Sequence, residues 1–254
     1  MTKNVSRRRI LAGLGASAGG LMLGGCDRIH RSAVMQDVFD GGSVLTHRAQ
    51  RLIVDRDALA REFSAADMSP VFRMNGNRAV NDPAWNALAG GSFADWRLRI
   101  DGLVAKPLDL SLAQLRAMPA RTQITRHDCV EGWSAIGQWT GTPLALLLKA
   151  AGLKASARFI VFHCADDFGG TPYYESIDLI DAFHPQTILA WNMNGAPLAT
   201  GHGAPLRLRV ERQLGYKHAK FVKRIEAVPT LAGIGRGQGG YWEDVAGYQW
   251  YAGI

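Results

Sequence analysis

The chain has 254 residues, of which 47% are hydrophobic and 20% are charged. This composition supports a full buried core, as one large domain or two small ones, and excludes a disordered or fibrous protein. The formal net charge is +7, but Lys3, Arg7, Arg8 and Arg9 lie before residue 26 and supply a large part of it. Because no block of Lys or Arg follows, we expect no nucleic-acid partner and only a small anionic ligand or partner.

Residues 6–11 read Ser-Arg-Arg-Arg-Ile-Leu and precede a weakly apolar run of Gly, Ala and Leu. This order is typical of a twin-arginine export signal, and a basic, frayed terminus is the alternative. It predicts a signal peptide over residues 1–25 and a periplasmic protein. Since this pathway carries folded proteins, most often with a cofactor inserted beforehand, we expect a cofactor. No apolar run reaches the roughly 20 residues of a membrane-spanning helix, so we expect no integral membrane protein.

The signal ends in Leu23-Gly24-Gly25-Cys26, which resembles a lipobox. If Cys26 is lipidated, the following Asp27 favours retention at the inner membrane, by analogy with enterobacterial lipoproteins. An ordinary cleavage site with an incidental cysteine fits the same small residues. Both readings stay open.

The rest of the chain predicts a helical arm over residues 26–68 and one domain over residues 69–254. Apolar residues at helix-like spacings over 43–63 indicate one or two amphipathic helices. Beyond residue 69, alternating patterns predict strands over 96–100, 121–126, 158–163, 189–193, 206–210 and 221–228. One helix is expected to begin at the N-cap Ser111, and another at Thr142-Pro143, with its end at Gly152. The fold class is therefore α+β, with mixed β-sheets and short helices.

The C-terminal segment is rich in aromatic residues. We expect them to cover apolar surface of the same domain, and docking of a partner is the alternative. They are Tyr241, Trp242, Tyr248, Trp250 and Tyr251.

Two cysteines remain beyond the signal region, Cys129 and Cys164. In an oxidising compartment their default state is a disulfide. Cys129, however, follows Arg126 and His127, which we expect to favour the thiolate, the form that binds soft metals or attacks electrophiles. Zinc would need further ligands at suitable spacing, and haem attachment would need a C-x-x-C-H motif. The residues leave a single-thiolate cofactor site and a thiol enzyme open.

The segment from Phe72 to the C-terminus resembles the sulfite oxidase superfamily of molybdopterin-binding oxidoreductases. Within it, the sequence is most similar to the branch of periplasmic methionine-sulfoxide reductase catalytic subunits. The resemblance rests on Gly102-Leu103-Val104 through Ser111, on Cys129-Val130-Glu131-Gly132-Trp133-Ser134, and on Gly141-Thr142-Pro143-Leu144.

The resemblance implies a molybdenum ion held by Cys129 and by the two dithiolene sulfurs of one pyranopterin. It also implies a set of cofactor contacts, which are Phe72, Asn75, Gly76, Cys164, His202, Arg207, His218, Ala219 and Lys220. Arg207 and Lys220 are suited to a phosphate and an anionic dithiolene. Each alone would be better explained as a charge on a solvated strand or at a strand end, but together with the Cys129 motif they favour cofactor binding. Tyr173 falls near the family's active-site tyrosine. Tyr174 could take that place, or either ring could simply pack.

The sequence departs from sulfite oxidases where those enzymes bind an oxyanion with arginines. Met74, with Arg73 one step away, and Ser134 stand at these places, so a sulfite dianion should bind poorly. The Tyr-Glu pair that follows the asparagine in the reductase branch is absent too. We expect a small, sulfoxide-like substrate, with sulfite oxidation as the alternative. The sequence ends at Ile254, which leaves no room for the dimerisation domain that follows in sulfite oxidases, so we expect a monomer.

These observations predict an exported molybdenum oxidoreductase that transfers an oxygen atom and two electrons. The chain carries no haem or iron–sulfur motif, so family analogy suggests a membrane b-type cytochrome as redox partner. Two rivals remain: a thiol-dependent enzyme using Cys129, and a binding module held by a Cys129–Cys164 disulfide.

Overall fold

The computed structural model describes residues 32–254. The expected signal peptide over residues 1–25, and the lipobox with Cys26 and Asp27, lie outside the described residues. The chain divides after Ile53 into two units, and the second, from Val54 to Ile254, is compact. In the part of the chain that the structure describes, no helix is both long enough and apolar enough to cross a membrane.

The helix α2 runs from Ala33 to Ile53, so the helices expected over 43–63 are wrong beyond Ile53. The physical reason is local. The Asp55 side chain accepts a hydrogen bond from the amide of Asp57, a turn that competes with helical hydrogen bonding. The chain then runs along the compact unit, where the amide of Phe63 donates to the carbonyl of Ile124. The segment just after α2 therefore belongs structurally to the second unit.

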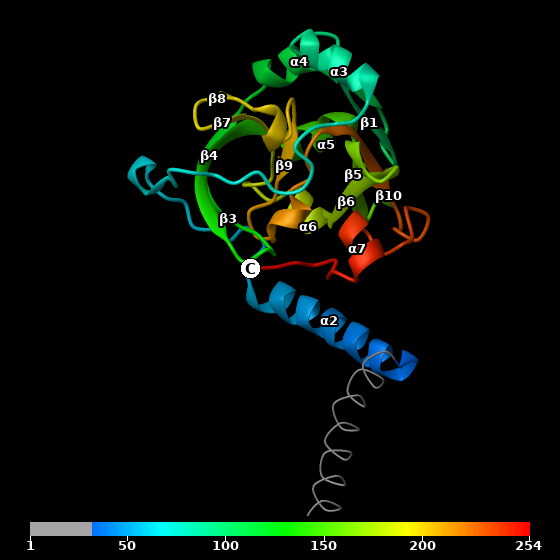
Figure 1. The fold of residues 1–254 in the computed structure, drawn as a ribbon. Helices are drawn as coiled ribbons and strands as arrows, with labels where there is room; N and C mark the ends of the chain where they lie inside the picture. The colour runs from blue at the N-terminus through cyan, green and yellow to red at the C-terminus, as the bar shows by residue number, and fades with distance from the viewer. Residues whose placement is uncertain (1–31) are drawn as a thin grey trace, which may run out of the picture. The chain divides into compact units, whose positions relative to one another are not determined.

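Two five-stranded sheets form the compact unit (Figure 1). The first has the strand order β2-β1-β10-β5-β6, in which β1 and β10 are parallel and the other pairs are antiparallel. Its strands are β1 (Arg97–Gly102), β2 (Leu108–Ser111), β5 (Phe159–Phe168), β6 (Thr171–Asp178) and β10 (Val222–Val228).

The second sheet is antiparallel, with the order β3-β4-β7-β8, and β9 also pairs with β7. At the bulge between β4 and β7, a Cβ on Gly141 would lie 2.2 Å from the carbonyl oxygen of Leu189, so only glycine fits this close approach. Its strands are β3 (Arg121–Asp128), β4 (Ser134–Pro143), β7 (Ile188–Met193), β8 (Ala196–Pro197) and β9 (Arg207–Arg209).

Short helices connect the strands. The α-helices are α3 (Pro83–Gly90), α4 (Leu112–Ala117), α5 (Leu144–Ala151), α6 (Leu179–Ala182) and α7 (Tyr241–Ala246). The 3-10 turns are η1 (Ala65–Asp67), η2 (Thr200–His202) and η3 (Gly215–Lys217).

The expected helix ends are mostly confirmed. Ser111 caps α4 in a capping box with Gln114, and Gly152 ends α5 with a φ of 68°. Thr142 does not cap α5, because Pro143 occupies the N-cap and the Thr142 hydroxyl instead donates to the carbonyl of Leu115. Thr142 thus joins α4 to β4 rather than starting a helix.

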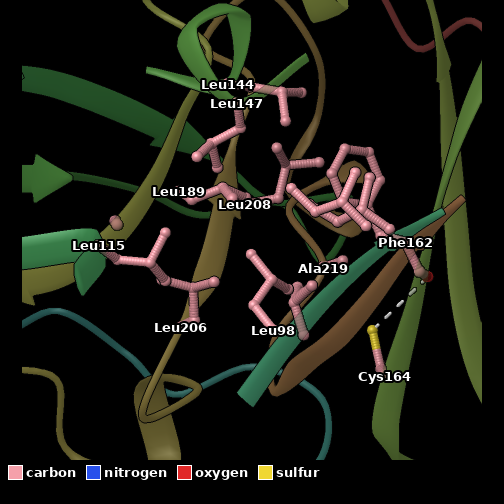
Figure 2. Packing of buried hydrophobic residues seen from close by; sticks show 14 of the residues in the cluster. Leu98, Leu115, Leu144, Leu147, Phe162, Cys164, Leu189, Leu206, Leu208 and Ala219 are labelled. Atoms are coloured by element: carbon pink, nitrogen blue, oxygen red, sulfur yellow. Dashed lines mark hydrogen bonds between the residues drawn. The ribbon is translucent and has the colours of Figure 1, made fainter. Parts of the chain in front are cut away.

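Leucines from both sheets and from α4 and α5 meet in one core. Figure 2 shows Leu98 of β1, Leu115 of α4, Leu147 of α5 and Leu208 of β9 pointing toward one another, and all four are fully buried. Cys164 of β5 lies at the margin of this cluster, with its sulfur 3.9 Å from the carbonyl oxygen of Phe162. Burial of these side chains is the main source of stability, at about 1.5–3 kcal/mol for each fully buried Leu.

A buried ion cluster joins the C-terminal helix α7 to the sheets. The ammonium of Lys217 lies 2.6 Å from a carboxylate oxygen of Glu175 on β6 and 2.6 Å from one of Glu243 on α7, and all three side chains are inaccessible. Burial lowers the pKa of Lys217, but the two carboxylates outweigh it and raise that pKa above its ordinary value. Burial raises the pKa of Glu175 well above its ordinary value. Lys217 is therefore a charged residue that holds three elements together.

We predict that Lys217→Met destabilises the protein by about 3–5 kcal/mol, because it leaves two carboxyl groups buried without a cation. The loss should shrink as the pH falls and the carboxyl groups take up protons. Urea unfolding followed by circular dichroism measures both effects. Lys223→Met, at an exposed position of β10, is the matched control. Equal stability of the two variants would contradict the prediction.

Candidate functional site

A partly open cavity of about 150 Å³ lies among loops that are far apart in the sequence. Its lining comes from residues 75–77, from 129–131 after β3, from the β5 and β6 hairpin, from 215–220 and from the C-terminal segment. A turn positions the thiol of this cavity. The amide of Cys129 donates to the carbonyl of Trp133, and Gly132 completes the turn with a φ of 84°. Cys129 is 8% exposed.

The expectation that neighbouring positive charge favours the Cys129 thiolate is wrong. Arg126 is paired with Asp128, and burial together with nearby Arg209 and Arg207 holds the pKa of His127 well below its ordinary value, so its ring is neutral. Burial raises the pKa of the Cys129 thiol. A metal ion bound at the sulfur would reverse this effect, because coordination deprotonates a thiol.

Two arginines of β9 lie side by side over the indole of Trp139, at 4.9 Å for Arg207 and 4.3 Å for Arg209. Arg209 is neutralised by Glu211, 2.5 Å away. Arg207 forms no ion pair with any described carboxylate, and it donates to the backbone carbonyls of His202 and His218 at 3.1 and 3.3 Å. Burial and the charge of Arg209 lower its pKa to about 9. Its positive charge is thus buried without an anionic partner.

Lys220 adds a second cation and fastens two loops together. Its ammonium donates to the carbonyls of Asn75 at 2.6 Å, of Asn77, and of Gly201 at 3.0 Å. Burial and the charge of Arg207 lower its pKa to about 7, while the three carbonyls favour its charged form. A Cβ on Gly203 would lie 2.8 Å from the Lys220 Cβ, so a glycine there allows this lysine to approach the loop.

Three neutral histidines surround the arginines. Arg209 donates to Nδ1 of His127, which leaves the proton of His127 on Nε2, a buried atom with no partner. Nε2 of His218 is 3.0 Å from the carbonyl of Gln213 and therefore donates to it, so the buried Nδ1 is an unpartnered acceptor. Burial and Arg207 lower the pKa of His202 to about 4.

The unsatisfied groups near the cavity describe the ligand that would satisfy them. They include two donors, Nε of Arg207 and Nε2 of His127, and one acceptor, Nδ1 of His218. An unpaired buried cation is costly unless an anion compensates it. An anionic group with hydrogen-bonding edges and a soft-metal centre at Cys129 fits these residues. The phosphate, pterin ring and dithiolene of a molybdopterin have these properties.

The structure brings most of the sequence-predicted residues together. Those that line the cavity are Asn75, Gly76, Cys129, Tyr173, His218 and Lys220. Behind them, Arg207 is hydrogen bonded to His202 and His218, and Ala219 lies between two lining residues. The Phe72 ring packs 5.5 Å from His127 and 5.8 Å from His202. Cys164 packs in the core instead (Figure 2).

Tyr173, and not Tyr174, faces the cavity. The Tyr173 hydroxyl donates to the carbonyl of Tyr216 at 2.7 Å, and burial raises its pKa well above the ordinary value. The Tyr174 hydroxyl instead donates to Asp244, outside the cavity.

Sequence reasoning missed a large part of the cavity wall. Asn77 and Asp166 line it, as do the aromatic side chains of Phe168, Tyr216, Trp242 and Tyr248. Of the C-terminal aromatics, Trp242 and Tyr248 are therefore wall residues, while Tyr241 stacks on Phe168 and Trp250 packs on Phe159. Their aromatic character was visible in the sequence, but only the fold shows which rings face the cavity.

Loops of the two β-sheets bring Arg207 and Lys220 close to a cavity that contains one thiol, that of Cys129. This arrangement is that of a cofactor-binding domain rather than of a site that uses a thiol alone. A family model described as the oxidoreductase molybdopterin binding domain matches residues 88–231, and the chain belongs to this family. The family and the fold are as the sequence predicted, and so is the class of enzyme, an oxidoreductase.

The chain is also similar to curated proteins. It is 41% identical over 160 residues to a putative protein-methionine-sulfoxide reductase subunit from Azospira oryzae, covering 63% of this chain and 56% of that protein. It is 36% identical over 150 residues to a protein-methionine-sulfoxide reductase catalytic subunit from Xanthomonas campestris, covering 55% of this chain and 47% of that protein. The chain thus spans about half the length of these relatives.

Among solved structures, the sulfane dehydrogenase SoxCD from Paracoccus pantotrophus is 26% identical, with a TM-score of 0.49. The match covers 54% of this chain and 39% of that one. The loop of residues 75–77 and the C-terminal wall lie outside the residues that the family model matches.

The two arginines of β9 should respond differently to substitution. Arg207→Met should change the stability of the cofactor-free protein by no more than about 1 kcal/mol, because no carboxylate loses a partner. Arg209→Met should cost about 3–5 kcal/mol, because it leaves Glu211 buried and unpaired. Urea unfolding of protein produced without molybdenum measures this difference, and elemental analysis of protein produced with molybdenum should show that Arg207→Met binds less metal. The reverse order of stabilities would contradict the assignment of Arg207 to an anionic ligand.

Proposed function

We propose that this protein is an exported, molybdenum-dependent oxidoreductase that reduces a small sulfoxide. The observation that carries the proposal is the unpaired buried cation Arg207, which is hydrogen bonded to His218 in the wall of the cavity that also contains the buried thiol of Cys129 and several aromatic rings. The names of the two curated relatives, which are protein-methionine-sulfoxide reductase subunits, support a sulfoxide as substrate.

The chain's own residues divide the work of holding the cofactor, one pyranopterin with its molybdenum. Cys129 would ligate the metal, Arg207 would pair with the phosphate, and His218 would accept a hydrogen bond from the ligand. Lys220 holds the loop of residues 75–77 in place through its carbonyl contacts. When bound, the cofactor supplies two-electron redox chemistry and transfer of an oxygen atom.

The cavity suits a neutral, partly apolar substrate. Among the described residues that line it, Lys220 is the one Lys or Arg, and its ammonium already donates to three carbonyls. The Ser134 hydroxyl donates to Asp128, so it offers no charge to an oxyanion. Trp242 and Tyr248 can contact the sulfur and carbon atoms of a sulfoxide. A sulfite dianion would lack the paired cations that it needs.

Two rival functions have less support. In the described residues, Cys129 and Cys164 are both free thiols, which argues against a binding module that depends on a disulfide between them. Burial raises the pKa of Cys129, which works against a thiol enzyme, since the thiolate is the nucleophile.

The electron donor and the location are parts of the proposal that rest on sequence. The twin-arginine pattern of residues 6–11 supports export to the periplasm, and lipidation of Cys26 would place the protein at the inner membrane. The three cysteines are too few for a four-cysteine iron–sulfur cluster. We therefore assign electron delivery to a membrane b-type cytochrome. Separately, we propose that the catalytic subunit is a monomer.

Steady-state assays with purified holoenzyme test the reaction. With a reduced viologen dye as electron donor, methionine sulfoxide and dimethyl sulfoxide should be consumed, while sulfite should not reduce ferricyanide at a comparable rate. Rapid oxidation of sulfite with no reduction of either sulfoxide would overturn the proposal in favour of a sulfite-oxidising enzyme.

Trp242→Leu should raise the KM for a sulfoxide about tenfold, which corresponds to about 1.4 kcal/mol of binding free energy. Its molybdenum content should be unchanged, since the Trp242 ring packs on Phe168, Tyr241 and Tyr248, none of which is assigned to the cofactor. Trp191→Leu is the matched control, because Trp191 is also half-buried and lies outside the cavity. Identical KM values for the two variants would remove Trp242 from substrate binding.

A further inference from the structure

Asp166 is a buried carboxyl group in the cavity that the proposed cofactor contacts do not use. It lies near the end of β5, is 4% exposed and lines the cavity together with Cys129 and Tyr173. One of its oxygens, Oδ2, accepts a hydrogen bond from the side-chain amide of Asn77 at 3.0 Å. The other, Oδ1, is buried and has no hydrogen-bond partner in the protein.

The position of Asp166 is fixed from outside the β-sheet. The Asn77 amide also donates to the carbonyl of Asp167 at 2.9 Å, so one side chain holds both the carboxyl group and the strand that carries it. The carbonyl of Asn77 is in turn bound by Lys220. The Asp166 carboxyl group therefore has one defined orientation, which a catalytic group requires.

The surroundings raise the pKa of this carboxyl group, which extends the pH range over which it keeps its proton. Burial raises the pKa of Asp166, the amide of Asn77 and the charge of Lys220 lower it, and the neighbouring Asp167 raises it again, with a net increase. No described Lys or Arg forms an ion pair with it. The other titratable groups near it are Cys164 on the same strand and Tyr173 on β6, both of which burial keeps neutral.

An acidic proton on Oδ1 has no acceptor within the protein, so its acceptor must be a molecule in the cavity. Because the proposed ligand is anionic, an ionised Asp166 beside it would be repelled, which favours the neutral acid further. A neutral acid that faces a reacting oxygen is a general acid.

We propose that Asp166 is the catalytic proton donor for reduction of the substrate, an inference that rests on the proposed sulfoxide reductase function. In this reaction the S–O bond breaks and sulfur gains two electrons; a reduced haem protein would supply these electrons, and the cofactor, when bound, would supply the two-electron redox chemistry. The oxygen leaves as water after taking up two protons, one from Asp166 and one from solvent. Asp166 then recovers its proton from water in the partly open cavity. Asn77 is a positioning residue that holds the carboxyl group.

The test is Asp166→Asn in the holoenzyme, because asparagine keeps the acceptor for Asn77 and removes the acidic proton. We expect kcat for methionine sulfoxide to fall at least about 100-fold, with an unchanged molybdenum content. In the wild type, kcat should fall as the pH rises through the pKa of Asp166. Asp167→Asn, on the same strand with its side chain outside the cavity, keeps the acceptor for the Gly170 amide and should retain activity. Asp166→Ser serves as a second variant if Asp166→Asn does not fold.

Thermal unfolding gives a readout that does not depend on turnover. The pKa of Asp166 is higher in the folded protein than the unfolded value of about 3.9, so the wild type loses stability as the pH rises through this interval. Asp166→Asn escapes this loss, so its Tm relative to that of the wild type should be higher at about pH 8 than at about pH 4. A purely structural role would make the variant less stable at both pH values.

The outcomes separate the two proposals. A kcat within about threefold of the wild type would overturn the role of Asp166, and so would loss of molybdenum, which would make Asp166 a cofactor-holding residue. If the wild-type holoenzyme reduces no sulfoxide, the proposed function fails. The unfolding experiment then still decides whether Asp166 carries a proton, and a Tm difference that is independent of pH would show that it does not.

Discussion

The unpaired guanidinium of Arg207 is the constraint on which the rest of the site depends. It lies on β9 beside Arg209, which has its own carboxylate partner in Glu211, so the two neighbouring cations differ in what they still lack. Backbone carbonyls and the face of Trp139 stabilise Arg207 in part, but they carry no full negative charge. A bound anion would compensate the buried positive charge of Arg207, and the loops around Arg207 carry the groups that would contact it.

Side-chain contacts of Lys220, Arg207 and Lys217 fix the positions of those loops relative to one another. Lys220 binds carbonyls of the loop of residues 75–77 and of the turn at Gly201, while Arg207 binds the segments that end η2 and η3. Lys217, the residue before His218, forms an ion pair with Glu243 of α7. This ion pair fixes the C-terminal segment, which contributes Trp242 and Tyr248 to the cavity wall. The residues proposed to hold the cofactor and the aromatic residues proposed to contact the substrate thus both depend on the short segment of residues 217–220. A change in that segment should affect both.

Much of the fold and of the floor of the site followed from the sequence. The alternation of residues 96–100 and the capping pattern at Ser111 predicted β1 and α4, because local periodicity and a short-range hydrogen bond determine them. The Cys129 motif led to the family because it is contiguous. The helix expected over 43–63 ends at Ile53. Beyond it, backbone amides bond to the side chains of Asp55 and Gln186 and to the carbonyl of Ile124 instead of to helical carbonyls.

The rest could not be predicted, because it depends on which distant segments meet. Asp166 looks like an ordinary strand acid until the structure places it beside Asn77, and Trp242 looks like a packing residue until the ion cluster fixes α7. The thiolate expected at Cys129 was wrong for a related reason. The charges next to it in sequence are paired or neutralised by residues remote from it.

Metal analysis of the holoenzyme, purified from the native compartment, tests the central claim most directly. Wild-type protein should contain nearly one molybdenum per chain, and a Cys129→Ser variant of equal thermal stability should lack the metal or hold it without redox activity. Wild-type protein that is fully folded, active on a sulfoxide and free of molybdenum would contradict the assignment of Cys129 and Arg207 to a molybdopterin site.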